Sequence, residues 1–134
     1  MSDTSEDESF APFAGLDFFV LDDEFLIGSD IQQMLESAGA RSVVYVSTIE
    51  EARAAIETGA HFDLAILDLL LGREGRSSLA LAETLTRRKI PLVFITGMGS
   101  EGRHAEIFPE VPVLLKPYHE AEFIAAVRRA LRRR

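Results

Sequence analysis

Five short apolar runs alternate with amphipathic stretches along the chain. The runs are rich in β-branched and aromatic residues, which is typical of strands covered on both faces. They span residues 17–21, 41–46, 64–71, 91–97 and 113–115. Between them, apolar residues recur at the spacing of amphipathic helices. Strand and helix in strict alternation predict right-handed crossovers and one parallel sheet between two helical layers, with the element order (βα)5.

The helical stretches differ in strength. We expect strong helices over 25–38 and 78–88, a helix that ends at about residue 58, and a last helix that begins at about residue 120. The segment 97–112 contains three glycines and two prolines, so its helix is expected to be short and weakly anchored.

Length and composition favour a single domain. The chain has 134 residues, 47% of them hydrophobic, which is enough for one domain with a substantial core. Residues 1–15 are polar, acidic and interrupted by proline and glycine, so we expect a flexible leader there and the domain over 16–134. The chain has no cysteine, which excludes disulfides, thiol catalysis and cysteine-held metals.

Charge argues against nucleic acid as a direct partner. The formal net charge is −8, and the first 40 residues hold ten acids and no lysine or arginine. Such a chain lacks a broad basic surface. The five arginines near the end favour the carboxyl end of a helix, although contact with phosphate remains an alternative. With neither a signal peptide nor an apolar run of membrane length, we expect a cytoplasmic protein that does not enter membranes.

Polar residues fall at the ends of four predicted strands. Asp22 and Asp23 follow the first strand, Asp68 ends the third, Thr96 ends the fourth and Lys116 ends the fifth. Because ligands bind at the carboxyl ends of parallel strands, where the strand order reverses, these side chains are expected to converge.

Each of these residues also has an ordinary structural interpretation. The acids at 22 and 23 suit the start of a helix, and Thr96 and Lys116 alone are unremarkable strand and loop residues. Asp68 is harder to explain in this way, because it sits in an apolar run with no helix to cap. Together the set fits phosphoryl transfer to a carboxylate, with Mg²⁺ or Mn²⁺ among the acids and an ammonium opposite.

On these residues the chain resembles the receiver domains of two-component response regulators. The match is Asp22-Asp23, Asp68, Thr96-Gly97 and Lys116-Pro117, and it extends over 17–134. The resemblance implies a (βα)5 flavodoxin-like, doubly wound sheet of five strands. Within the family, the fourth-strand motif Phe-x-Thr-Gly is similar to the corresponding motif of small stand-alone alphaproteobacterial receivers.

The resemblance also implies a role for each site residue. Asp68 is the expected phosphoacceptor, and it ligates Mg²⁺ together with Asp23 and the backbone carbonyl of Leu70. Asp22 holds the ion through water. Thr96 binds a phosphoryl oxygen and Lys116 pairs with the phosphate.

One feature common in the family is absent. The switch aromatic three residues before the lysine is replaced by Val113, and Tyr118 lies on the other side of the lysine. The usual coupling between threonine and aromatic ring is therefore not expected here.

We thus expect a single-domain response regulator and phosphoprotein rather than a turnover enzyme, since it catalyses only its own phosphorylation and dephosphorylation. A histidine kinase or histidine phosphotransfer protein supplies the phosphoryl group, and the output is contact with a downstream protein or a phosphorelay; a homodimer is possible.

Two alternatives stay open. A hydrolase of the haloacid dehalogenase type uses similar groups, but it needs an acid where this chain has Leu70. A pseudo-receiver would act as an interaction module without phosphorylation.

Overall fold

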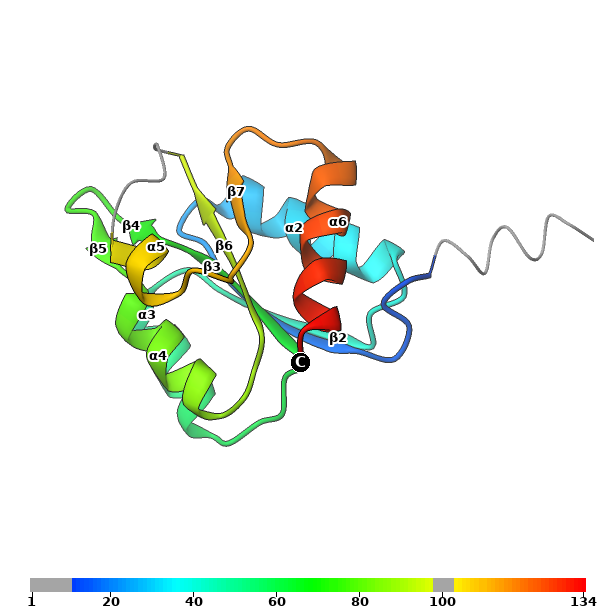
Figure 1. Cartoon of the computed structure of the whole chain (residues 1–134), viewed down its shortest axis with the longest axis horizontal. Coiled ribbons are helices and arrows are strands. Elements are labelled where there is room, and N and C mark those ends of the chain that lie inside the picture. The colour runs from blue at the N-terminus through cyan, green and yellow to red at the C-terminus, as the bar shows by residue number, and fades with distance from the viewer. Residues whose placement is uncertain (1–10, 98–102) are drawn as a thin grey trace, which may run out of the picture.

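The computed structural model describes residues 11–97 and 103–134, and Figure 1 shows a central parallel sheet with helices on both faces. The strands of this sheet are β1 (Asp17–Leu21), β2 (Ser42–Val46), β3 (Leu64–Asp68), β6 (Leu92–Thr96) and β7 (Val113–Leu115). The helices are α2 (Phe25–Ser37), α3 (Ile49–Glu57), α4 (Leu79–Arg87), α5 (Arg103–Ile107) and α6 (Glu120–Arg132). The strand order is β2-β1-β3-β6-β7, which confirms the predicted flavodoxin-like fold.

Side chains that alternate along the strands build two apolar layers. In β1, Phe18 and Val20 pack into the layer under α2 and α6, whereas Phe19 and Leu21 pack into the layer under α3 and α4. All four are fully buried. Since burial of such a side chain stabilises a fold by about 1.5–3 kcal/mol, these layers fix the sheet and therefore its edges.

The parallel register brings the predicted polar residues to one edge. Leu21 of β1 pairs with Leu67 of β3, so the residues that follow them, Asp22 and Asp68, are neighbours across the two strands. On the other side of β3, Thr96 of β6 pairs with Leu115 of β7, next to Lys116. The strand order reverses between β1 and β3, which is where ligands bind in such sheets.

The third strand ends at Asp68, as predicted, although the apolar run continues to Leu71. The chain leaves the sheet after Asp68, and β4 (Leu70–Leu71) turns back against β5 (Arg76–Ser77) as a separate antiparallel hairpin. Leu69 and Leu71 are nevertheless buried in the layer under α3 and α4. The apolar run therefore continues past the end of the strand because the hairpin also packs on the core.

The start of the domain was placed too late. Phe13 is fully buried, its ring meets Phe18 edge to face, and its N–H donates to the carbonyl of Ala38. Residues 11–15 therefore belong to the packed domain rather than to a flexible leader; the rest of the predicted leader, 1–10, lies outside the described residues.

The short helix expected within 97–112 is confirmed as α5, five residues long, with residues 98–102 outside the described part. Among the described helices, none has both the length and the apolar composition needed to cross a lipid bilayer.

Gly28 allows α2 to lie close to β2. A Cβ atom at this position would come within 2.1 Å of Cε1 of Tyr45. We predict that Gly28→Ala lowers the free energy of unfolding by about 1–3 kcal/mol, because the ring must move, although alanine is the better helix former. Urea unfolding measures this. In a Tyr45→Ala background the same substitution should stabilise; stabilisation by Gly28→Ala in the native background would contradict the close approach.

A second prediction concerns Asp17, which begins β1. Arg41 donates to both of its carboxylate oxygens and Ser42 Oγ donates to Oδ1 at 2.8 Å. These hydrogen bonds lower the pKa of Asp17 from 3.8 to about 2. A lowered pKa means that the ionised group stabilises the fold above its unfolded pKa and that this contribution is lost as pH falls through about 2.

We therefore expect Asp17→Asn to reduce the free energy of unfolding by about 1–2 kcal/mol at pH 7. The difference from the native protein should shrink as pH falls from the unfolded pKa of 3.8 to the folded pKa of about 2. Chemical unfolding at each pH provides the measurement, and the exposed Glu57→Gln is the control. An unchanged difference at low pH would argue against the ion pair as the cause.

Candidate functional site

Asp68 ends β3 and is almost completely buried, with 4% of its surface exposed. Its Oδ2 accepts a hydrogen bond from Lys116 Nζ at 3.1 Å, and its Oδ1 lies 3.4 Å from the backbone N–H of Leu70. Strands β1 and β6 flank β3 on its two sides. The predicted acceptor thus lies almost buried at the carboxyl end of the central strand, where it lines a polar cavity.

Asp22 lies beside Asp68 and is 1% exposed. Its Oδ1 accepts from the N–H of Glu24 at 2.8 Å, whereas its Oδ2 accepts no hydrogen bond from any described residue. A buried carboxylate oxygen without a donor is costly, by about 1–3 kcal/mol or more for a charged group. The one ion-pair partner of Oδ2 among the described residues is Lys116, whose Nζ lies 3.5 Å away, so the oxygen is also suited to ligate a metal cation.

Lys116 faces three carboxylates. Its Nζ lies 2.8 Å from Oε1 of Glu24, 3.1 Å from Oδ2 of Asp68 and 3.5 Å from Oδ2 of Asp22. The backbone N–H of Lys116 donates to the carbonyl of Thr96 at 2.8 Å, which fixes the end of β7 against β6. The peptide bond that follows, Lys116–Pro117, is cis. One ammonium therefore neutralises only part of the charge in the cluster.

The pKa values reflect burial first and charge second. Burial raises the pKa of Asp68 to about 6, and the neighbouring charge of Asp22 adds to the rise. Burial likewise raises the pKa of Asp22. For Lys116, burial lowers the pKa, but the hydrogen bond to Glu24 and the charges of Asp22 and Asp68 outweigh it, so its pKa is raised. The two aspartates thus repel each other while the lysine stays charged.

Asp23 takes a different place from Asp22. It is exposed, and its Oδ2 accepts from the backbone N–H of Gly72 at 2.9 Å, which ties the loop after β1 to the β4–β5 hairpin. Asp23, Leu70 and Thr96 all line the same cavity as Asp68 and Lys116. This cavity has a volume of about 380 Å³, and Gly97 lies at its wall.

Two further residues contribute to the site. The sequence leaves Glu24 open between a helix cap and a metal ligand; it is the N-cap residue of α2, and its side chain adds the third carboxylate around Lys116. Tyr45 donates its hydroxyl to the carbonyl of Asp22 at 2.8 Å and so holds the loop that carries this acid. Its only signal in the sequence is a tyrosine near the end of a predicted strand.

The acids fit a hard divalent cation. One oxygen each of Asp22, Glu24 and Asp68 lies within 4.8 Å of the others. Carboxylate oxygens are the preferred ligands of Mg²⁺, and the buried Oδ2 of Asp22 accepts no hydrogen bond from the described residues, with Lys116 Nζ 3.5 Å away. Asp23 is not among these three, but it lines the same cavity. The expected ligand roles of Asp23 and of the Leu70 carbonyl stay predictions.

Comparison with known proteins gave solved structures only; no protein-family model and no curated protein matches. SdrG from Sphingomonas melonis is 34% identical, with 87% of this chain and 97% of that chain covered and a TM-score of 0.74. A response regulator receiver protein from Sinorhizobium medicae is 24% identical over 88% of this chain and 95% of its own, with a TM-score of 0.78. The chemotaxis response regulator CheY4 of Vibrio cholerae is 19% identical over 87% and 99%, with a TM-score of 0.70.

The sheet order, the acidic cluster at its carboxyl edge and these similarities lead to one assignment. The chain belongs to the receiver domains of response regulators.

Proposed function

We propose that this receiver accepts a phosphoryl group on Asp68 from the phosphohistidine of a histidine kinase or phosphotransfer protein, with Mg²⁺ as its cofactor. It then signals through contact with a downstream protein or passes the group on in a phosphorelay. In this proposal the protein works in the cytoplasm, modifies only itself and turns over no other substrate.

One observation carries the proposal: two buried carboxylates lie side by side at the carboxyl end of the sheet and share one lysine. Asp68 and Asp22 both face Lys116, and the Oδ2 of Asp22 accepts no hydrogen bond from the described part of the chain. A structural ion pair would need only one acid, because a second buried carboxylate on the same lysine adds repulsion. A site for a cation and a phosphoryl group uses all three.

The reaction follows from these positions. A carboxylate oxygen of Asp68 attacks phosphorus, a P–O bond forms, the P–N bond to the donor imidazole breaks, and the imidazole leaves with its electron pair and takes up a proton. Lys116, already 3.1 Å from Asp68, stays close enough to pair with the charge that the new phosphoryl group brings. Thr96 at the adjacent strand end is placed to donate its hydroxyl to a phosphoryl oxygen.

Mg²⁺, when bound, would neutralise charge on the transferring group and on the acids. Asp22 and Asp68 would hold it, with Glu24 or Asp23 completing the acidic shell. The bound cation would also favour the ionised form of both aspartates, which burial and their mutual repulsion oppose.

The pseudo-receiver alternative keeps one observation in its favour: Val113 stands at the position of the switch aromatic, and Tyr118 is stacked on Phe123 of α6 instead. That arrangement concerns the transmission of a signal, not the acceptor itself. A phosphorylation assay therefore separates the two proposals.

We predict that incubation with Mg²⁺ and acetyl phosphate, or with a phosphohistidine donor, adds one phosphoryl group to the protein, as read by intact mass. Asp68→Asn should abolish the gain, because an amide is not a nucleophile for this transfer. Asp30→Asn, an exposed acid of α2, is the matched control and should be modified like the native protein. No modification by either type of donor would support the pseudo-receiver.

A further prediction concerns the cation. Asp22→Asn should weaken Mg²⁺ binding about tenfold or more, because it removes a buried negative charge whose Oδ2 accepts no hydrogen bond from the described residues. Isothermal titration calorimetry measures the affinity, and Glu57→Gln, an exposed acid of α3, is the control. Equal affinity in Asp22→Asn and the native protein would remove Asp22 from the proposed metal shell.

A further inference from the structure

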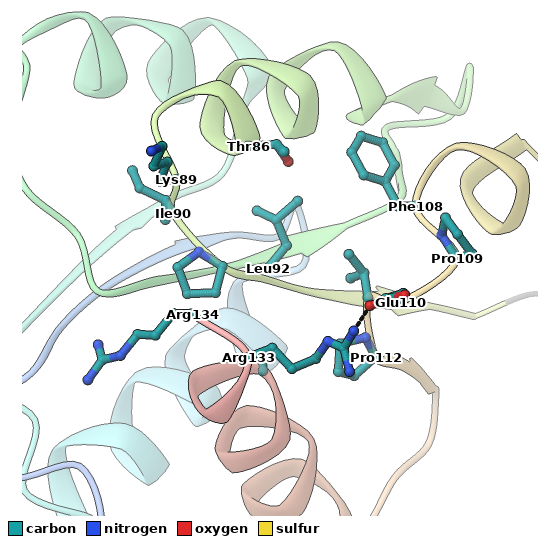
Figure 2. Close-up of a pocket in the computed structure, with 13 residues that line it drawn as sticks. Thr86, Lys89, Ile90, Leu92, Phe108, Pro109, Glu110, Pro112, Arg133 and Arg134 are labelled. Carbon is teal, nitrogen blue, oxygen red and sulfur yellow. Dashed lines mark ion pairs between the residues drawn. The ribbon is translucent and has the colours of Figure 1, made fainter.

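A second pocket lies at the edge of the sheet opposite the acidic cluster (Figure 2). It is formed where β6 and β7 begin and where α6 ends, and its volume is about 440 Å³. This volume falls within the range of small-molecule sites, about 300–1,000 Å³. The proposed phosphorylation chemistry does not involve it.

Apolar and rigid groups form the walls. Leu92 and Ala130, each 3% exposed, line the pocket together with Phe108. Pro91, Pro109 and Pro112 also line it, and a proline has a fixed backbone φ and carries no N–H. The pocket is therefore largely preformed, as ligand sites usually are.

The backbone around the pocket offers few free polar groups. The carbonyl of Pro91 accepts from Ala65 at 2.9 Å, and the carbonyl of Pro112 accepts from Phe94 at 2.9 Å. Both are thus occupied by hydrogen bonds within the sheet. A ligand would be held by apolar contact inside the pocket and by charged side chains at its mouth.

The mouth carries more positive than negative charge. Lys89, Arg133 and Arg134 line the pocket, against a single acid, Glu110. Glu110 forms an ion pair with Arg133 across the opening, and Figure 2 marks this pair with a dashed line. Both side chains are more than half exposed, so this pair is weak, worth about 0–1 kcal/mol, and an incoming anion can replace the acid.

The other two cations have different surroundings. Arg134 extends away from the pocket, toward Asp63, whose Oδ1 lies 3.4 Å from its Nη1. Lys89 makes no ion pair with any described residue, and its backbone has a positive φ of 64°, at the position after a helix where glycine is favoured. The chain thus keeps a long cationic side chain where glycine would be less strained.

We propose that this pocket binds a small amphiphilic anion, with an aliphatic chain lying over Leu92 and Phe108 and a carboxylate or similar head paired with Arg133 in place of Glu110. Charge complementarity at the mouth and the preformed apolar lining select this class of ligand. Glu110 then acts as an internal competitor for the arginine. This site is independent of the proposed phosphorylation of Asp68.

The test uses the full-length protein and octanoate as the probe, with octanol as the uncharged match. Titration followed by methyl NMR should give saturable chemical-shift changes at Ile90, Leu92 and Val111. Ile27 of α2, which does not line the pocket, should show none.

Three variants with small structural consequences then separate the contributions. Arg133→Gln should weaken octanoate binding by up to about fivefold, and Glu110→Gln should strengthen it by a similar factor, since an exposed pair is worth about 0.2–1 kcal/mol. Arg132→Gln removes the same charge one residue earlier, from a side chain that does not line this pocket, and should leave the affinity unchanged. Octanol binding should respond to none of them.

Several results would overturn the proposal. Shifts that rise linearly without saturation would mean that the pocket holds no ligand of this class. Equal effects of Arg132→Gln and Arg133→Gln, or weaker octanoate binding in Glu110→Gln, would show that the head group is not held at this mouth.

Discussion

The site depends on one lysine that faces more negative charge than it can neutralise. Lys116 Nζ lies within 3.5 Å of oxygens from Asp22, Glu24 and Asp68, two of which come from almost fully buried residues. In a low-dielectric environment, a single cation between several anions leaves residual repulsion. Burial raises the pKa of Asp68 to about 6, and this repulsion adds to the rise. The cluster lacks a second positive charge, which the proposed Mg²⁺ would supply.

The fold makes such a cluster possible because its register is set elsewhere. The fully buried side chains of β1, β3 and β6 pack in two layers that have no part in the chemistry. A slip of one residue in any strand would exchange its two faces, which the buried layers forbid. Tyr45 and Gly28 then fix the loop after β1. Because Gly28 has no side chain, the Tyr45 ring can pack against it, and the Tyr45 hydroxyl donates to the carbonyl of Asp22. Packing thus supports the positions of groups that would otherwise repel one another.

The sequence was sufficient for the sheet, for the alternation of elements and for the convergence of Asp22, Asp68, Thr96 and Lys116, because strand ends are local features and parallel topology brings them together. It was insufficient where an apolar residue packs on the core from outside the predicted strands and helices. Leu69 and Leu71 look like strand residues but belong to a hairpin packed on the core, and Phe13 lies in a polar segment yet is fully buried. The sequence left the role of Glu24 open and gave no role to Tyr45, because both act through contacts with residues distant in the chain.

Helix direction explains why the two edges of the sheet differ in charge. Each helix that follows a strand begins at the carboxyl edge and ends at the opposite one, so its positive dipole end faces the acids around Asp22. At the opposite edge the carboxyl ends of α4 and α6 carry basic residues, Arg87 in one and Arg129 and Arg132 in the other. Cations are favoured there by the same dipoles, and at the end of α6 they continue into Arg133 at the mouth of the apolar pocket. The helix dipole thus accounts for the arginine-rich end without a nucleic-acid partner, and in our proposal Arg133 also pairs with the anion bound in the adjoining pocket.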